Sequence, residues 1–383
     1  MPESLKILHR LQTCAGFPCG LATVTATEGS SYRRPGARML LHANGQRFGA
    51  ISGGCLEEDM VAHLEGVVAS GRSKTLIYDT TLENDLVWGV GLGCNGKVTL
   101  LLERLEGSPA SLSFAQAAAD QRRVACVLAT VYHCDGAAGL GTCLGVAADG
   151  STWQQRIPAA WESSFAAPAA LALEKRKSLS CSFNHLSGSP AVFFEYIPPT
   201  PRLLVLGAGD DAQPLVDAAT KLGWSVIVAD PRSTFATPAR FPSAREVLIL
   251  KPETLNTHVT LDDHTFAVVM THHYVHDLPF LDQLIGQPLA YLGLLGPKKR
   301  AERLLQELQA MGRKVPPEAL SKLHAPVGLD LGGDAPEAVA LSMLAEMQAV
   351  LHHRDGTSLR LRCQPIHDST QAGPNLTAAQ TAD

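Results

Sequence analysis

The sequence predicts a two-domain α/β protein, with a mixed α/β domain in its N-terminal half and a Rossmann-like, doubly wound parallel sheet in its C-terminal half. First, the 383 residues exceed the usual size of one domain. Second, a stiff, proline-rich connector stands at residues 198–201. Third, apolar strands alternate with helices after this connector, which is typical of a parallel sheet with right-handed crossovers.

In the C-terminal half, the hydrophobic pattern defines the expected elements in order. We expect strands at 202–206, 224–229, 245–250, 266–270 and 289–293, and helices at 211–222, 278–285, 298–312 and 336–353. This series predicts a Rossmann-like domain at 199–360. The remaining residues, 361–383, are rich in polar and small residues and predict a disordered tail.

The N-terminal half is less regular. We expect helices at 4–14 and 56–70, the second ended by Gly71, and strands at 20–27, 38–43, 46–51, 74–79 and 97–103. Asn44 and Gly45 predict a hairpin between two of these strands. Further along, we expect strands at 124–133 and 193–197, a turn-rich piece at 136–145 and a partly helical segment at 155–185, and no internal repeat is evident. We therefore place a cofactor domain at 1–110 and a middle segment with its linker at 111–198.

The composition is that of a globular chain, with 45% hydrophobic and 18% charged residues. The net charge of -5 argues against a nucleic-acid partner. No signal peptide and no long apolar run is evident, so we expect no membrane partner and a cytoplasmic location. Nine cysteines without paired CxxC motifs are typical of a reduced compartment and argue against a structural zinc site.

A glycine-rich turn follows the first strand of the C-terminal half. Gly207, Gly209 and Ala212 form a GxGxxA pattern that permits a tight turn and a close approach of backbone to a pyrophosphate. Asp230 ends the next strand about 20 residues on, where an acid that binds ribose belongs. However, carboxylates at 210 and 211 would repel an anion at the helix start. The pattern therefore leaves open whether this fold binds a nucleotide or nothing.

Two segments of the N-terminal half combine glycines with groups that bind anions or soft metals. Arg33, Arg34 and Arg38 surround a turn, and an arginine fork suits a phosphate. Cys55 follows Gly53 and Gly54 at a strand-to-helix junction, where the helix dipole lowers a thiol pKa. We therefore predict a site for an anionic cofactor in this half.

A third segment resembles the second, because Cys94 follows Gly93 in another glycine loop. Thiolates are soft ligands, so Cys55 and Cys94 are candidate metal contacts. The alternative is that both are small buried residues beside glycines that turn corners. No histidine lies in either motif to favour a Cys–His nucleophile.

Other candidate sites lie after later strands of the C-terminal half. The basic run 298–300 opens a helix and either binds an anion or forms a solvated face. His272, His276 and Asp277 follow a strand, where they could contact a substrate, hold a metal or form structural hydrogen bonds. Asp330 precedes another glycine pair and is a weaker candidate.

Taken together, these segments resemble the XdhC/CoxI family of accessory proteins that mature molybdenum hydroxylases. The resemblance is carried by GSSYRRPGARM at 29–39, SGGCLE at 52–57, GLGCNGK at 91–97, GAGDDAQPL at 207–215, ADPR at 229–232, THHYVHD at 271–277, YLGLLGPKKR at 291–300 and PVGLDLGGDAPE at 326–337. It covers about residues 5–105 and 195–355. The middle segment matches little.

The resemblance implies a chaperone rather than an enzyme. Such a protein binds the molybdenum cofactor (molybdopterin), protects it during sulfuration and delivers it to an apo-hydroxylase. Its implied partners are that hydroxylase and a cysteine desulfurase, and a homodimer is also expected. The resemblance places Cys55, Cys94 and the neighbouring glycines and arginines at the cofactor.

Two other hypotheses stay open at this point. One is an NAD(P)-dependent oxidoreductase that uses Gly207, Gly209 and Asp230 for its nucleotide and His272 or His276 for proton transfer. The other is an interaction scaffold whose glycine loops are mere turns, which predicts no small ligand.

Overall fold

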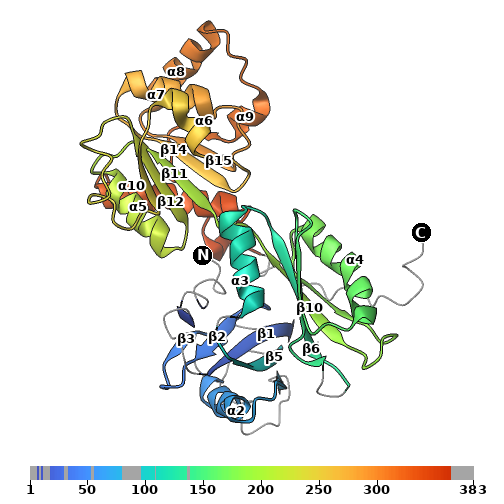
Figure 1. Cartoon of the computed structure of the whole chain (residues 1–383). Helices are drawn as coiled ribbons and strands as arrows, with labels where there is room; N and C mark the ends of the chain where they lie inside the picture. The colour runs from blue at the N-terminus through green and yellow to red at the C-terminus, as the bar shows by residue number, and fades with distance from the viewer. Residues whose placement is uncertain are drawn as a thin grey trace. The chain divides into compact units, whose positions relative to one another are not determined.

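The computed structural model describes residues 7, 10–11, 18–29, 33–52, 56–79, 96–107, 109–135 and 139–363. Residues 2–199 and 200–367 form two compact units (Figure 1). Within the described residues, the first unit contains two five-stranded antiparallel sheets, and the second contains a six-stranded parallel sheet. The predicted fold class is therefore confirmed. The helix expected at 4–14 and the tail expected at 361–383 lie largely outside the described residues.

The first sheet of the N-terminal unit has the order β3-β2-β1-β5-β4. It is built from β1 (Cys19–Gly29), β2 (Arg38–Leu41), β3 (Arg47–Gly49), β4 (Lys74–Asp79) and β5 (Gly96–Leu105), with α2 (Glu57–Ser70) on one face. Leu64 and Val67 of α2 pack against Val24 and Leu100. Gly45 turns the expected hairpin with a φ of +82°, and Gly71 ends α2 in the left-handed region, so both predictions are confirmed.

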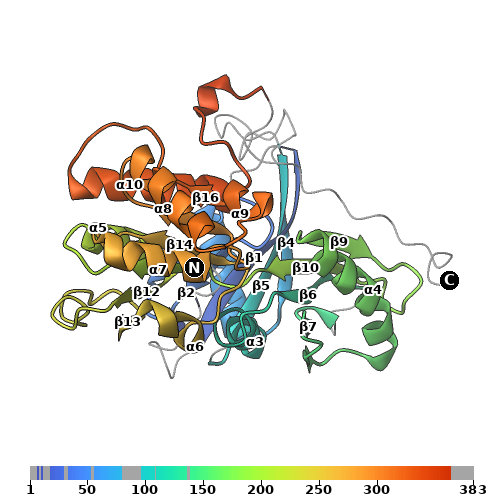
Figure 2. The same ribbon diagram turned by 90° about the horizontal axis from the view of Figure 1, so that it is seen from above.

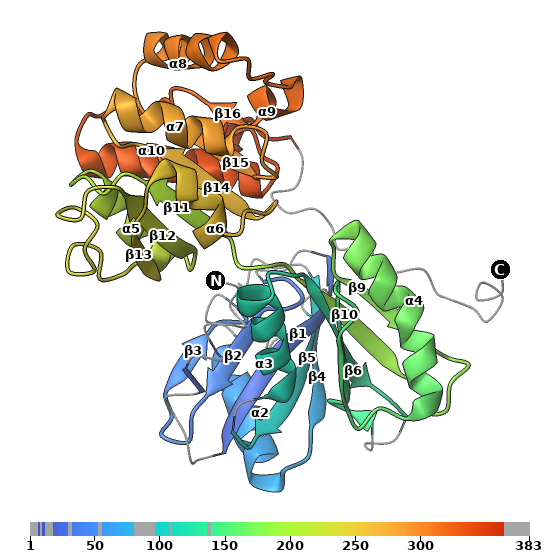
Figure 3. The same ribbon diagram turned by 45° about the horizontal axis from the view of Figure 1, so that its top comes forward.

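The second sheet has the order β8-β7-β6-β10-β9. It is built from β6 (Cys126–His133), β7 (Cys143–Ala147), β8 (Thr152–Gln155), β9 (Leu179–Ser182) and β10 (Ala191–Ile197). Helix α4 (Ala159–Lys175) covers one face through Trp161 and Phe165 (Figure 3), while α3 (Ala110–Gln116) and the π-helical turn η1 (Ala117–Gln121) precede the sheet. The turn-rich piece expected at 136–145 is wrong in part, because strand β7 begins within it.

The two sheets have the same topology. In each, three strands are followed by a helix and two strands, and the first strand lies in the middle of the sheet with the second and the fifth beside it. The central strands also share a sequence, CGLATV at 19–24 and CVLATV at 126–131. The expectation of no internal repeat is thus wrong: the two sheets are copies of one unit, and the repeat is hard to see in the sequence because few residues outside the central strand are identical.

Register shows that individual residues of the two repeats are equivalent. Leu21 lies opposite Glu103, and its counterpart Leu128 lies opposite Glu195. Likewise, Thr23 lies opposite Arg38 on β2, whereas Thr130 lies opposite Cys143 on β7.

The two sheets lie side by side in Figure 2 and contact each other through equivalent groups. Thr75 donates a hydrogen bond to the carbonyl of Tyr132, and Ser180, which is equivalent to Thr75, donates to the carbonyl of Thr25 at 3.4 Å. Because each contact is the exchanged copy of the other, the repeats are related by a local pseudo-twofold axis.

The C-terminal unit is a Rossmann fold with the strand order β13-β12-β11-β14-β15-β16, all parallel. Its strands are β11 (Arg202–Leu206), β12 (Ser225–Asp230), β13 (Glu246–Ile249), β14 (Thr265–Val269), β15 (Tyr291–Leu294) and β16 (Leu323–His324). Its helices are α5 (Ala212–Lys221), α6 (Leu255–His258), α7 (Tyr274–Leu284), α8 (Lys298–Ala310), α9 (Pro317–Ser321) and α10 (Pro336–Leu351), with short 3-10 turns η3 (Pro252–Thr254) and η4 (Leu359–Leu361).

Alternate residues of the central strand bury opposite faces of this sheet. Leu203 and Val205 pack with α5 and α10, whereas Leu204 and Leu206 pack with α6, α7 and α8. Figure 1 shows these helices on the two sides of the sheet. A strand covered on both faces has to be apolar throughout, which explains the unbroken run that predicted it.

Substituting Gly207 with alanine tests the close packing at the end of β11. An added Cβ would lie 2.4 Å from the Met270 carbonyl oxygen, and the φ of Gly207 is +127°. We expect Gly207→Ala to lower the free energy of unfolding by more than about 3 kcal/mol. Gly286→Ala is the control, because Gly286 has a φ of +86° with open space around it and should lose only about 1 kcal/mol. Equal losses in urea unfolding would contradict the packing argument.

Candidate functional site

The glycine turn of the Rossmann unit is shaped by its own side chains. The Asp211 carboxylate lies over Gly209, where an added Cβ would be 2.5 Å from Oδ1, and its Oδ2 is 2.7 Å from His272 Nε2. Asp210 accepts a hydrogen bond of 2.7 Å from Arg240. A carboxylate therefore lies against the glycine that would approach a pyrophosphate.

Asp230 is fully buried and makes four hydrogen bonds. Its Oδ2 accepts from the Ala208 amide at 2.8 Å and from Arg232 at 2.7 Å, and its Oδ1 accepts from the Arg232 amide and side chain, both at 2.9 Å. Burial alone would raise the pKa of Asp230, but the hydrogen bonds from Arg232 and Ala208 hold it below its usual value. Because a carboxylate offers about four lone pairs, a ribose hydroxyl would have to displace Arg232.

The polar residues after β14 form hydrogen bonds and an ion pair within the protein. Asp277 is 1% exposed, accepts hydrogen bonds from the amide and hydroxyl of Thr271 and forms a 2.5 Å ion pair with Arg300. The rings of His273 and His276 lie 5.8 Å apart. No group of three metal-ligating side chains occurs in the described part of the chain. Among the alternatives for this cluster, these contacts favour structural hydrogen bonding.

The predicted cofactor residues of the N-terminal unit fall into two groups. Gly53, Gly54, Cys55, Gly93 and Cys94 lie outside the described residues, and their roles stay predictions. The arginines lie within them, and Arg34 is exposed, Arg33 half-buried and Arg38 buried.

Arg38 has a protein partner. Its guanidinium forms a bidentate ion pair with Glu195 of the second sheet, and one nitrogen also donates to the Gly36 carbonyl at 3.0 Å. The side chains of Arg38 and Glu195 are 6% and 11% exposed. A phosphate would have to compete with this buried carboxylate, whereas Arg33 and Arg34 stand nearer the surface.

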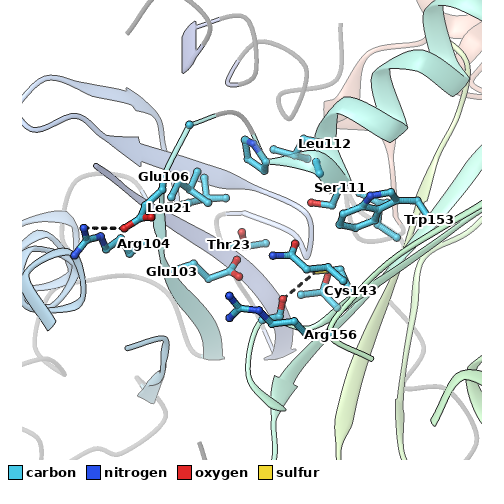
Figure 4. Close-up of a pocket in the computed structure, with 18 of the residues that line it drawn as sticks. Leu21, Thr23, Glu103, Arg104, Glu106, Ser111, Leu112, Cys143, Trp153 and Arg156 are labelled. Carbon is cyan, nitrogen blue, oxygen red and sulfur yellow. Dashed lines mark hydrogen bonds and ion pairs between the residues drawn. The ribbon is translucent and has the colours of Figure 1, made fainter. Parts of the chain in front are cut away.

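A cavity of about 680 Å³ lies between the two sheets, lined by residues of β1, β2, β5, α3, β6, β7 and β8. Thr23 and Glu103 line one side, and Ser111, Cys143 and Trp153 line the other (Figure 4). The lining is largely polar, and its size is in the range of small-molecule sites. No sequence motif predicted this cavity.

Glu103 is a carboxylate of the cavity that combines a raised pKa with the lack of a partner among the described residues. No hydrogen bond or ion pair joins its carboxylate to any residue that the structure describes, and burial raises its pKa from 4.5 to about 7, against the opposing effect of Arg38. A shift of this size corresponds to about 3 kcal/mol of destabilisation when the group is ionised. An unpaired carboxylate held in a cavity at such a cost is a candidate functional group.

The duplication explains why Glu103 has no partner among the described residues. Glu103 and Glu195 are equivalent, and so are Cys143 and Arg38. Arg38 of the first repeat pairs with Glu195 of the second, but Cys143, which faces Glu103, is a neutral thiol. Burial and the Glu103 charge raise the pKa of Cys143 to about 12. The second ion pair of the interface is therefore missing, and the cavity lies in its place.

Comparison with known proteins agrees with this architecture. Residues 14–79 match the XdhC and CoxI family, and residues 203–347 match the XdhC Rossmann domain. The chain therefore belongs to the XdhC and CoxI family, and the predicted resemblance is confirmed. No helix in the described part of the chain is long and apolar enough to cross a membrane.

Several relatives are similar over most of their length. A probable xanthine dehydrogenase subunit from Bacillus subtilis is 33% identical over 328 residues, which covers 85% of this chain and 91% of the relative. The molybdenum cofactor insertion chaperone PaoD from Escherichia coli is 23% identical over 338 residues, covering 88% and 85%. The crystal structure of a xanthine dehydrogenase from Bacillus halodurans has a TM-score of 0.71 and 27% identity, covering 94% and 98%.

The same substitution at the two equivalent glutamates should have opposite effects on stability. Because the pKa of Glu103 is raised, the folded state still binds a proton at this carboxyl between pH 4.5 and about 7, where the unfolded state has lost it. The free energy of unfolding therefore falls as the pH rises through that window. At pH 8 we expect Glu103→Gln to stabilise the protein by up to about 3 kcal/mol, a gain that vanishes below pH 4.5.

Glu195→Gln is the matched comparison. It leaves Arg38 buried without its charge partner, so we expect a loss of about 3–5 kcal/mol. Urea unfolding at several pH values measures both effects. A loss of similar size for both variants at pH 8 would show that the two carboxylates are in equivalent environments, contrary to this description.

Proposed function

We propose that this protein binds the molybdenum cofactor, protects it, supports its sulfuration and delivers it to a molybdenum hydroxylase such as xanthine dehydrogenase. The observation that carries this proposal is the similarity to the cofactor insertion chaperone PaoD along most of both chains, within a shared family. The hydroxylase apo-enzyme and a cysteine desulfurase would be its partners, and a homodimer its assembly.

The chemistry of the N-terminal unit suits this cargo. Molybdopterin carries a phosphate and a metal held by a dithiolene, so its carrier needs donors for an anion and a soft ligand near the metal. Arg33 and Arg34 supply cationic donors near the surface. Cys55 and Cys94 would supply the thiolates. Glycines 53, 54 and 93 would let the backbone approach the cofactor closely.

Cofactor retention tests the proposal. Protein expressed with molybdate should be purified with molybdenum and molybdopterin in stoichiometric amounts, measured by elemental and pterin analysis. We expect Cys55→Ala and Cys94→Ala to lower the retained molybdenum, because each removes a soft ligand. Cys363→Ala is the control, since Cys363 is an exposed cysteine of the second unit. Full retention by both variants and their double mutant would eliminate the thiol roles.

The second candidate function is that of an NAD(P)-dependent oxidoreductase, which would bind its nucleotide in the Rossmann unit. Two contacts weigh against it: the Asp211 carboxylate lies over Gly209, and Asp230 has no free lone pair for a ribose.

Thermal unfolding with added NAD or NADP separates these functions. A ligand that binds only the folded state raises the midpoint with concentration. We expect neither nucleotide to change the midpoint. A saturable rise with either one would support the oxidoreductase and would assign Gly207, Gly209 and Asp230 to its nucleotide.

A further inference from the structure

The cavity between the sheets lacks the guanidinium that pairs with the equivalent carboxylate in the other half of the interface. At the equivalent position across the pseudo-twofold axis, a carboxylate receives two parallel N–H donors from the Arg38 guanidinium, at Oε1 and Oε2 of Glu195. Glu103 faces Cys143 instead, and a thiol offers one weak donor. By comparison with Glu195, the group that would satisfy the hydrogen-bonding capacity of the Glu103 carboxylate is a planar edge with two adjacent N–H donors.

None of the three arginines that line the cavity forms an ion pair or a hydrogen bond with Glu103. Of the arginines that line the cavity, Arg38 is bound to Glu195, and Arg104 is bound to the Val68 carbonyl at 3.1 Å and to Glu106 at 2.9 Å. Arg156 forms no ion pair or hydrogen bond with a residue that the structure describes. Arg156 is therefore the cation available to an anionic part of a ligand.

The other lining groups suit a flat, polar ring. Trp153 lines the cavity from β8, is half-buried and stacks on no aromatic ring among the described residues. Stacking on an indole is favourable for any heterocycle with a π-face. The hydroxyls of Thr23 and Ser111 line the same space and can donate or accept.

We propose that this cavity binds the 2-amino-4-oxopyrimidine edge of a pterin, with Glu103 accepting hydrogen bonds from the ring N–H and the 2-amino group and with Trp153 stacking on the ring. That edge has the N–C–N geometry of half a guanidinium, so it replaces the arginine that the second repeat lacks. The inference rests on the proposed function, because the cargo of that function contains a pterin. It assigns the pterin end of the cargo to the space between the sheets.

Binding of free pterins to the full-length protein tests the assignment. Pterin-6-carboxylate is titrated by its fluorescence, beside the matching lumazine, which has an oxo group in place of the 2-amino group, and beside guanosine, which shares the edge but not the pteridine ring. We expect the protein to prefer the pterin over the lumazine by about tenfold or more, because a charged hydrogen bond is lost. Guanosine binding as tightly as the pterin would instead assign a guanine site and would overturn the proposal.

Three variants identify the residues responsible. Glu103→Gln should lose the preference for the pterin while the protein stays folded, since this substitution removes the charge of a carboxylate that has no partner among the described residues. Cys143→Arg supplies the missing guanidinium, so it should abolish pterin binding and raise the unfolding temperature. Glu106→Gln is the control, because it removes a charge at the same cavity from a carboxylate already paired with Arg104, and it should bind as the wild type does.

The outcome separates this inference from the proposed function. If the wild type retains molybdopterin and both Glu103→Gln and Cys143→Arg retain as much, the function stands and the assignment of the cavity is overturned. If the wild type retains no molybdopterin yet selects the pterin through Glu103, the assignment stands and the chaperone function is lost. Equal binding of pterin and lumazine by the wild type overturns the assignment in either case.

Discussion

The buried ion pair between Arg38 and Glu195 is the interaction on which the N-terminal unit depends. It joins β2 of the first sheet to β10 of the second across 157 residues of sequence, and both partners are almost entirely shielded from water. A buried pair of this kind adds little net stability over apolar packing, but it strongly disfavours arrangements that leave one charge unpaired. It therefore fixes how the two repeats meet.

A duplicated structure normally presents two copies of each interface contact. Here the hydroxyl contacts of Thr75 and Ser180 keep that symmetry, and so do Gly36 and Gly141, which approach the carboxylates of Glu195 and Glu103. The ion pair does not, because Cys143 stands in the place of an arginine. One half of the interface is filled by the Arg38–Glu195 ion pair. The other half is a cavity lined by the ionisable side chain of Glu103.

Elements with a local signature could be predicted from the sequence. The parallel sheet follows from its apolar strands and from the glycine turn after β11, and the hairpin follows from Asn44 and Gly45. Of the second antiparallel sheet, only the strands expected at 124–133 and 193–197 were predicted. The other three, β7, β8 and β9, have four or five residues each and were not recognised. The duplication left a signal in the repeated CxLATV, which comparison of the two halves would have found.

The candidate site was harder to predict for a physical reason. A glutamate in an amphipathic strand, such as Glu103, normally lies on a solvated face, and only the packing of a second sheet buries it. Arg38 was predicted as a donor to a cofactor anion, and its ion pair with Glu195 could not be predicted because that carboxylate is distant in sequence. Asp230 was predicted at the end of its strand. Its saturation by Arg232 could not be predicted, because it depends on the local backbone path that turns this nearby guanidinium back onto the carboxylate.

Glu103 is a half-buried carboxylate of the cavity with no partner among the described residues, and we infer that a bound pterin supplies its two missing donors. Its ionisation can be followed directly by NMR of carboxyl-labelled glutamate, assigned through Glu103→Gln, with and without bound pterin. We expect the Glu103 pKa to be about 7 in the free protein and to fall clearly when the pterin binds. An ordinary glutamate pKa in the free protein, unchanged by the pterin, would contradict this inference.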